Sequence, residues 1–156
     1  MSDPCDLSAT DARRLIGEKT LSPVELMESC IARVEAVDPA VNAMPARDFE
    51  RALATARSHE HAVMAGDALG VLHGLPVGIK DMVDVAGLKT TYGSLAFRDN
   101  VAQTDEGLVA DLRREGAIVL GKTNVPEWSA GGNSRNAVYG TTGNPFDPTK
   151  SAAGSS

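Results

Sequence analysis

Hydrophobic residues recur at helical spacing along the first 65 residues of the chain. Ser8 precedes an acidic first turn and the apolar pair Leu15 and Ile16, which predicts a short helix with Ser8 as its N-cap and Gly17 at its end. The segment Ser22-Pro23-Val24-Glu25 has the pattern of a capping box with proline at the first helical position. It therefore predicts the start of a second helix.

The second and third predicted helices are longer. The second carries apolar residues at helical spacing, namely Leu26, Met27, Cys30, Ile31 and Val34. Asp38-Pro39 predicts its end, because proline disfavours the helical conformation of the residue before it. A third helix is predicted from roughly Asp48 to Ala65, with Phe49, Ala52, Leu53 and Ala56 on one face. Residues 1–65 thus form a helical front.

The pattern changes in residues 66–156, which hold 14 of the 15 glycines. Leu75 to Lys80 is a short apolar run that predicts a buried strand, and Ala117 to Leu120 predicts a second one. Thr104-Asp105-Glu106 predicts the N-terminal cap of a helix between them that ends at Gly116. Strand, helix and strand in this order predict parallel pairing with a right-handed crossover, and hence an α/β fold. Residues 121–156 show little regular pattern, which is typical of a long loop that is either functional or disordered.

Composition narrows the class of protein. The chain has 156 residues, 42% hydrophobic and 23% charged, which favours one globular domain of ordinary size. A net charge of −6 without a basic block argues against a nucleic-acid partner. No run of 18 apolar residues and no signal sequence are present, so we expect no membrane partner. Two cysteines, Cys5 and Cys30, form neither a disulfide framework nor a zinc site, which favours a cytoplasmic location.

One motif match points to nucleotide binding. Gly116-Ala-Ile-Val-Leu-Gly121-Lys122-Thr123 fits the phosphate-loop pattern. A phosphate loop exposes consecutive backbone N–H groups, whereas the four middle residues here are apolar and favour burial. A helix precedes the motif where a strand is needed, and Pro126 interrupts the chain soon after it. A nucleotide-binding module is therefore only an alternative.

Lys80 and the closing serines are the remaining candidates for chemistry. A lysine at the end of an apolar strand either reaches water or pairs with Asp81 or Asp84, or it is buried enough for the neutral amine to act as a base. The segment from Ser151 to Ser156 is either a tail or a tight loop that presents a hydroxyl. The histidines give weak signals: His59 and His61 are expected on the surface, and His73 is expected to make a structural hydrogen bond.

The ordered set of motifs resembles the amidase signature family. Gly74-Leu-Pro-Val-Gly-Ile-Lys80-Asp81 resembles its lysine strand, and Gly116 to Asn124 resembles the next strand and turn. Glu127-Trp128, Gly131-Gly-Asn133, Tyr139 to Asp147 and the final Gly-Ser-Ser resemble its active-site loop. The resemblance spans nearly the whole chain, with 75 positions between Lys80 and Ser155. It implies the N-terminal third of an amidase signature domain, in which a mixed central sheet is covered by helices.

The resemblance implies amide hydrolysis by a Ser–cis-Ser–Lys triad through an acyl-enzyme, with no metal and no cofactor. Lys80 matches the general base, and Ser155 matches the relay serine, which also contacts substrate and follows a cis peptide bond in the family. Ser129 falls where family members line the acyl pocket, although an ordinary loop serine is an equal alternative. The expected partner is a small-molecule amide, and a homodimer is the candidate assembly of a full-length enzyme.

The resemblance also implies what this stretch of sequence lacks. The family's nucleophilic serine lies downstream of the glycine-serine loop, which places it beyond Ser156. We therefore expect residues 1–156 alone to be inactive and to fold poorly, because their strands leave open sheet edges. Ala153 replaces a usual glycine and would be strained if φ is positive. A non-catalytic module that binds a partner through the acidic helical front is the other alternative.

Overall fold

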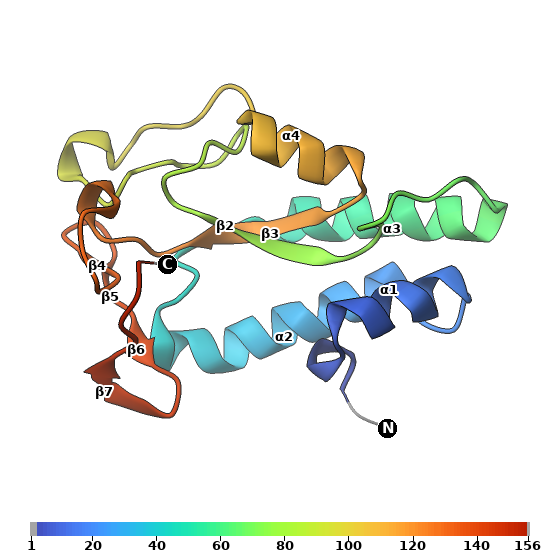
Figure 1. Ribbon diagram of the computed structural model, residues 1–156, viewed down its shortest axis with the longest axis horizontal. Helices are drawn as coiled ribbons and strands as arrows, with labels where there is room; N and C mark the ends of the chain where they lie inside the picture. Colours follow the sequence, from blue (N-terminus) through green and yellow to red (C-terminus); the bar gives the residue numbers. More distant parts are fainter. Residues whose placement is uncertain (1–2, 156) are drawn as a thin grey trace.

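The computed structural model describes residues 3–155, so Met1, Ser2 and Ser156, the second serine of the closing pair, lie outside the described residues. The main elements are α1 (Ala9–Gly17), α2 (Pro23–Val41), β1 (Ala46–Arg47), α3 (Phe49–Ala65), β2 (Pro76–Lys80), α4 (Gly107–Arg114) and β3 (Ile118–Thr123). Short 3-10 turns lie at η1 (Pro4–Asp6), η2 (Leu95–Phe97) and η3 (Glu127–Ser129). The α/β class and the order of helices and strands agree with the sequence pattern (Figure 1).

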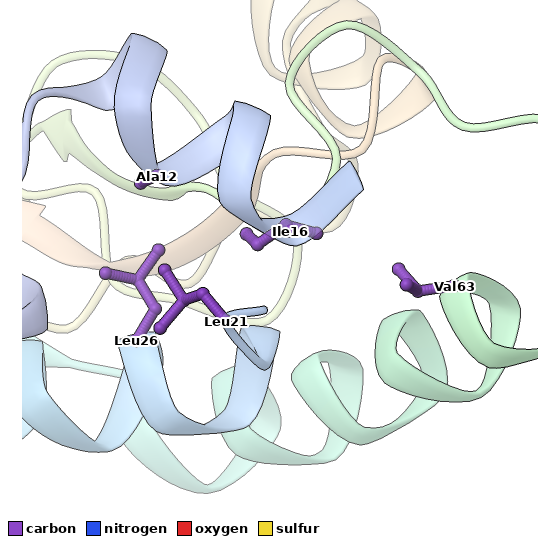
Figure 2. Close-up of a cluster of buried hydrophobic side chains, with 5 residues drawn as sticks. All are labelled: Ala12, Ile16, Leu21, Leu26 and Val63. Carbon is purple, nitrogen blue, oxygen red and sulfur yellow. The ribbon is translucent and has the colours of Figure 1, made fainter. Parts of the chain in front are cut away.

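The helical front begins at the predicted caps. The Ser8 hydroxyl accepts a hydrogen bond from the backbone N–H of Asp11 at 3.1 Å, and Ser22 and Glu25 form both bonds of a capping box at the start of α2. Apolar side chains from all three helices then meet in one cluster, shown in Figure 2: Ala12, Ile16, Leu21, Leu26 and Val63. This cluster joins α1 to the facing ends of α2 and α3.

The predicted end of α2 at Asp38-Pro39 is wrong, because the helix continues through Pro39 to Val41. A proline so close to the C-terminus removes only one hydrogen bond of the helix. The true end is set by Asn42, which adopts the left-handed conformation with φ of 56°. The buried Asp38 carboxylate supports this turn by accepting the backbone N–H of Met44 at 3.0 Å and by pairing with Arg47 at 2.9 Å.

The central sheet has the strand order β1-β3-β2. β2 and β3 are parallel, as predicted, and β1 pairs antiparallel with β3, so the sheet is mixed. The two-residue strand β1 was not predicted, because so short a segment carries no alternation that a pattern could show. Figure 1 shows α4 on one side of the strands and α2 on the other. Met27 of α2 and Ala52 of α3 pack against β3 in one cluster, so both helices cover the same face.

The buried strand β3 presents alternate residues to the two layers of helices. Ile118 and Leu120 pack toward α2 and α3, whereas Val119 packs toward Val109 of α4. The register with β2 then shifts between Val77 and Gly78, which is a bulge-like irregularity. As a result, every residue of β3 beyond the shift faces the side opposite to the one that simple alternation predicts.

Helix α4 begins at the predicted cap segment, but without a side-chain capping hydrogen bond. Glu106 is the N-cap residue, and its side chain makes no capping hydrogen bond. Asp105 instead accepts the backbone N–H of Ala86 at 2.8 Å and pairs with Arg113 at 3.0 Å. Asp105 therefore links the start of α4 to the loop at Ala86 and to Arg113 in the last turn of α4.

Residues after Asn124 fold into two small hairpins at the carboxyl end of the sheet. β4 (Arg135–Asn136) pairs with β5 (Gly140–Thr141), and β6 (Gly143–Asn144) pairs with β7 (Asp147–Ser151), all antiparallel. These strands carry no apolar alternation, so the sequence alone indicated only a loop. Figure 1 shows them together at the end of the sheet that also holds the described C-terminus.

Candidate active site

Lys80 and Ser155 meet at the carboxyl end of β2. Lys80 is the last residue of the strand, and its Nζ donates a hydrogen bond to Ser155 Oγ at 2.9 Å. Both side chains are partly buried. The two residues are 75 positions apart, so the fold assembles a contact that no local pattern encodes. The two strongest candidates from the sequence therefore lie in one place.

A network of side-chain amides holds the loop that delivers Ser155. Asn124 directly follows β3, and its Nδ2 donates to Thr142 Oγ1 at 3.0 Å. Asn136 Nδ2 donates to Asn124 Oδ1 at 2.7 Å, and Thr142 Oγ1 donates to the carbonyl of Asn42 at 2.8 Å. Asn124 is 1% exposed, so its amide is committed to these partners. The network fastens both hairpins to the end of β3.

The last step to Ser155 uses backbone groups. The N–H of Ala152 donates to the carbonyl of Thr142 at 3.1 Å, and the N–H of Thr142 donates to the carbonyl of Ser134 at 2.9 Å. Ser134 Oγ donates to the carbonyl of Gly154 at 3.5 Å, which is a long bond. The final residues are thus joined to the asparagine network through Thr142.

Backbone conformation before Ser155 differs from the family expectation in one respect. None of the peptide bonds within residues 3–155 is cis, so the bond between Gly154 and Ser155 is trans, and the expected cis bond is not found. Ala153 has φ of 57° and Gly154 has φ of 75°. The strain expected at Ala153 is confirmed, because its methyl group occupies a position that favours glycine.

Sequence reasoning missed a buried ion pair beside Lys80. Lys122 and Asp81 are both fully buried, with 3.6 Å between Lys122 Nζ and Asp81 Oδ1. Burial lowers the pKa of Lys122, and the Asp81 carboxylate opposes this shift. The sequence had offered Asp81 as one possible partner of Lys80. The structure pairs Asp81 with Lys122 and Lys80 with Ser155.

The bulge in the β2–β3 pairing explains this arrangement. Beyond it, Lys122 lies opposite Ile79, whose side chain belongs to the cluster with α4. Lys80 lies opposite Thr123, on the face where the backbone of Gly78 approaches the side chains of Thr123 and Met44. Adjacent lysine and aspartate side chains therefore point to opposite faces, and each finds a separate partner.

Ser129, the candidate for the acyl pocket, lies in η3 with φ of 56°. Its Oγ is 2.7 Å from Met82 Sδ, two residues beyond Lys80. Within the described part of the chain, no hydrogen bond joins Ser129 to Lys80 or Ser155. Its neighbour Trp128 is 51% exposed and stacks on Tyr92 with 5.2 Å between the ring centroids. Ser129 is thus at the same end of the sheet but outside the Lys80–Ser155 contact.

Two histidines stack against each other away from this site. The rings of His59 and His73 lie 4.1 Å apart at an angle of 20°, and His73 Nε2 is 3.1 Å from the carbonyl oxygen of His59. The hydrogen bond expected for His73 is confirmed, whereas His59 is half-buried and its Nδ1 is fully covered, so the solvated position expected for His59 holds only in part. His61 is exposed, as predicted.

The phosphate-loop match is a buried strand. Ile118 to Leu120 lie inside β3, and Lys122 is bound to Asp81 instead of facing an open loop. Gly121 is needed because a Cβ there would lie 2.5 Å from the carbonyl oxygen of Ala46 in β1. Its backbone therefore approaches a neighbouring strand and not an anion, so the nucleotide-binding alternative is wrong.

Residues 3–155 contain no group of three or more histidine, cysteine, aspartate or glutamate side chains arranged to hold a metal ion. The helices in this range are too short or too polar to cross a membrane.

The structure thus combines a lysine–serine hydrogen bond with a mixed sheet whose carboxyl end carries it and whose faces are covered by helices. The Amidase family profile matches residues 25–156. The chain belongs to this family, the amidase signature enzymes.

Individual relatives agree with this assignment. The chain is 42% identical over 150 residues to an acylamidase of Rhodococcus erythropolis, covering 96% of this chain and 31% of that protein. It is 37% identical to one subunit of the glutamyl-tRNA(Gln) amidotransferase of Streptomyces coelicolor, covering 99% of this chain and 31% of that one. A solved bacterial aryl acylamidase of the amidase signature family superposes with a TM-score of 0.89 at 31% identity, covering 96% of this chain and 31% of that one. The chain thus spans about a third of the length of the relatives it matches.

Proposed function

We propose that Lys80 and Ser155 are the base and the relay of a Ser–Ser–Lys triad that hydrolyses a carboxylic amide to an acid and ammonia or an amine. The observation that carries the proposal is the 2.9 Å hydrogen bond between Lys80 Nζ and Ser155 Oγ. It is supported by membership in the amidase family, whose profile covers both residues. The third member, the nucleophilic serine, is expected downstream of residue 156.

The pair is suited to moving a proton. In the proposed relay, Lys80 acts as a neutral amine and takes the proton of Ser155, while Ser155 takes the proton of the nucleophile. An adjacent base of this kind makes a serine hydroxyl reactive. The nucleophile attacks the amide carbon, the relay returns a proton to the departing amine, and water hydrolyses the resulting ester. No step requires a metal ion or an organic cofactor.

The proposed substrate is a small-molecule amide. The acylamidase of Rhodococcus erythropolis and the solved aryl acylamidase act on amides by name, whereas the Streptomyces relative is part of an amidotransferase. We assign Ser129 to the acyl pocket on its position beside Met82, near the end of the strand that carries Lys80. A cytoplasmic location and a homodimer remain predictions for the full-length enzyme.

The test is substitution of Lys80 by alanine in the complete natural chain that carries this sequence. Loss of the base is expected to lower kcat by about a thousandfold or more, because the triad acts as a unit. The matched control is Lys89→Ala, since Lys89 is exposed and pairs only with Asp99 on the surface. Turnover retained by Lys80→Ala with an intact fold would show that Lys80 is structural.

A second measurement tests whether the nucleophile lies outside the residues that contain Lys80 and Ser155. Residues 1–156 alone, incubated with a small amide, are expected to release no ammonia above the buffer rate. Release that depends on Lys80 would place the nucleophile within these residues and contradict the proposed division.

A further inference from the structure

Two charged side chains next to Lys80, one along the chain and one in the neighbouring strand, are completely buried. Asp81 follows Lys80 directly, and Lys122 lies across from Ile79 in the neighbouring strand; both are 0% exposed. A buried ion pair is weak evidence for stability, because desolvation offsets much of the attraction between the charges. Their place beside the candidate base therefore calls for another explanation.

Both groups are fully engaged by neighbouring atoms. Asp81 Oδ1 accepts the backbone N–H of Thr91 at 3.1 Å, and Asp81 Oδ2 accepts the hydroxyl of the same threonine. Lys122 Nζ donates to Thr90 Oγ1 at 2.9 Å and to the carbonyl of Lys89 at 3.3 Å. The pair is thus fixed by the loop that follows β2, and neither charge can turn toward Lys80.

We infer that Asp81 and Lys122 are positioning residues for Lys80, which act by cancelling each other's charge beside the base. This inference rests on the proposed role of Lys80. An uncompensated carboxylate near a lysine favours its ammonium form, which cannot accept a proton. Lys122 removes that effect by neutralising Asp81, and the Thr91 hydrogen bonds hold the carboxylate on the face opposite to Ser155.

Other ionisable groups around the pair increase the need for this balance. Asp84 and Glu106 also act on Lys122 through their charges, so the surroundings of the pair are acidic. Burial raises the pKa of the Tyr92 phenol, and the charges of Asp84, Glu106 and Asp81 add to this shift in that order. Burial also raises the pKa of Tyr139, with Asp81 as the second cause. Lys122 is the cation that faces these acids in the buried cluster.

The pH dependence of kcat/KM in the complete natural chain tests the inference. The acid limb is the fall of kcat/KM at low pH, and removal of one charge of the pair or the other is expected to move it in opposite directions. Lys122→Met leaves a buried negative charge, and the acid limb is expected to move up by about 1 pH unit. Asp81→Asn leaves a buried positive charge, and the limb is expected to move down by a similar amount. Lys122→Arg keeps the charge and is expected to keep the limb in place.

A matched control is the pair formed by Asp38 and Arg47 at the end of α2. Asp38 is 7% exposed and its carboxylate lies 2.9 Å from Arg47, whose side chain is 35% exposed, so this ion pair has a buried carboxylate but lies away from Lys80. Asp38→Asn is expected to lower stability without moving the acid limb. If the Asp81–Lys122 pair acted in folding alone, substitutions at Asp81, Lys122 and Asp38 would all lower stability and leave the acid limb in place.

Opposite displacements of the limb in Lys122→Met and Asp81→Asn support the inference. Displacements in one direction, or none, overturn it. If either single variant fails to fold, Asp81→Asn/Lys122→Met decides, since removal of both charges is expected to leave the limb within about 0.3 pH unit of wild type. A larger displacement in the double variant overturns the inference. Wild-type chain without amidase activity, or an active Lys80→Ala variant, instead overturns the proposed function and this inference with it.

Discussion

Acidification is expected to loosen the contact between α3 and the loop before β2, through the stacked rings of His59 and His73. His59 Nδ1 is buried and has no hydrogen-bond partner, and the two ring centroids are 4.1 Å apart. Burial, followed by the neighbouring His73, lowers the pKa of His59 from 6.5 to about 4. A proton on the buried Nδ1 of His59 would add a charge at an atom that has no hydrogen-bond acceptor among the described residues.

The size and sign of the effect follow from linkage. Above pH 6.5 His59 is neutral in both the closed and the opened state, and the full stability is present. Between pH 6.5 and 4 the opened state binds a proton that the closed state does not, so stability is lost as the pH falls. At pH 5 the complete shift would cost about 2 kcal/mol, and discounting it by half for partial exposure leaves about 1 kcal/mol.

Hydrogen exchange of the peptides that cover α3 and residues 70–75 measures this local opening. Exchange of the wild-type chain relative to a His59→Gln variant, compared at pH 7.5 and pH 5, cancels the intrinsic pH dependence of exchange. The free energy of opening is expected to fall by about 1 kcal/mol at pH 5 in wild type only, which is about a fivefold increase in exchange. His61→Gln, two residues along and exposed, is the control and should behave as wild type. Equal pH dependence in wild type and His59→Gln would refute this account.

Three further predictions concern the backbone and the open edge of the fold. Ala153→Gly, at φ of 57°, is expected to stabilise the Ser155 loop by about 0.5–1 kcal/mol and to slow exchange there; faster exchange would contradict the strain. Gly121→Ala is expected to cost about 1–3 kcal/mol in urea unfolding, because its Cβ would lie 2.5 Å from Ala46 O; Gly132→Ala, with open space around the Cβ, is the control and should cost little. Residues 1–156 alone are expected to unfold over a broad thermal range, and a sharp transition would contradict this. Their accessible surface of 8192 Å² exceeds the roughly 7,500 Å² of a compact protein of this mass, and it includes Phe146 at 96% exposure.

The elements that could be predicted from the sequence are those whose signals are local. Ser8 and the Ser22–Glu25 capping box place the starts of α1 and α2, because a cap and the N–H groups it satisfies lie within three residues. The apolar runs before Lys80 and after Gly116 also give local signals, and they correspond to β2 and β3. β3 is buried along nearly its whole length, whereas only Ile79 is buried in β2. Parallel pairing then follows from the helix between them.

Features that depend on distant partners could not be predicted in this way. Pro39 stays inside α2 because Asp38 caps the next turn and pairs with Arg47, a contact made only after β1 has folded back. His59 appeared to belong to the surface by helical spacing, and it is covered because the loop carrying His73 returns to α3. In both cases the deciding partner is nine or more positions away along the chain.

In the candidate site, the orientation of Lys122 likewise depends on a distant partner, because the bulge in the β2–β3 pairing sets it. Strict alternation along β3 would place Lys122 on the face of Ile118 and Leu120, among the apolar side chains of α2 and α3. The bulge turns it to the face of Ile79, and only there does it meet Asp81. One extra residue in a strand therefore decides which of two neighbouring lysines is neutralised by a carboxylate and which remains free to bind a serine. Deleting Leu120, the residue of β3 without a partner in β2, would straighten the strand and leave Lys122 opposite Ile79, so the Lys122–Asp81 contact is expected to survive this deletion.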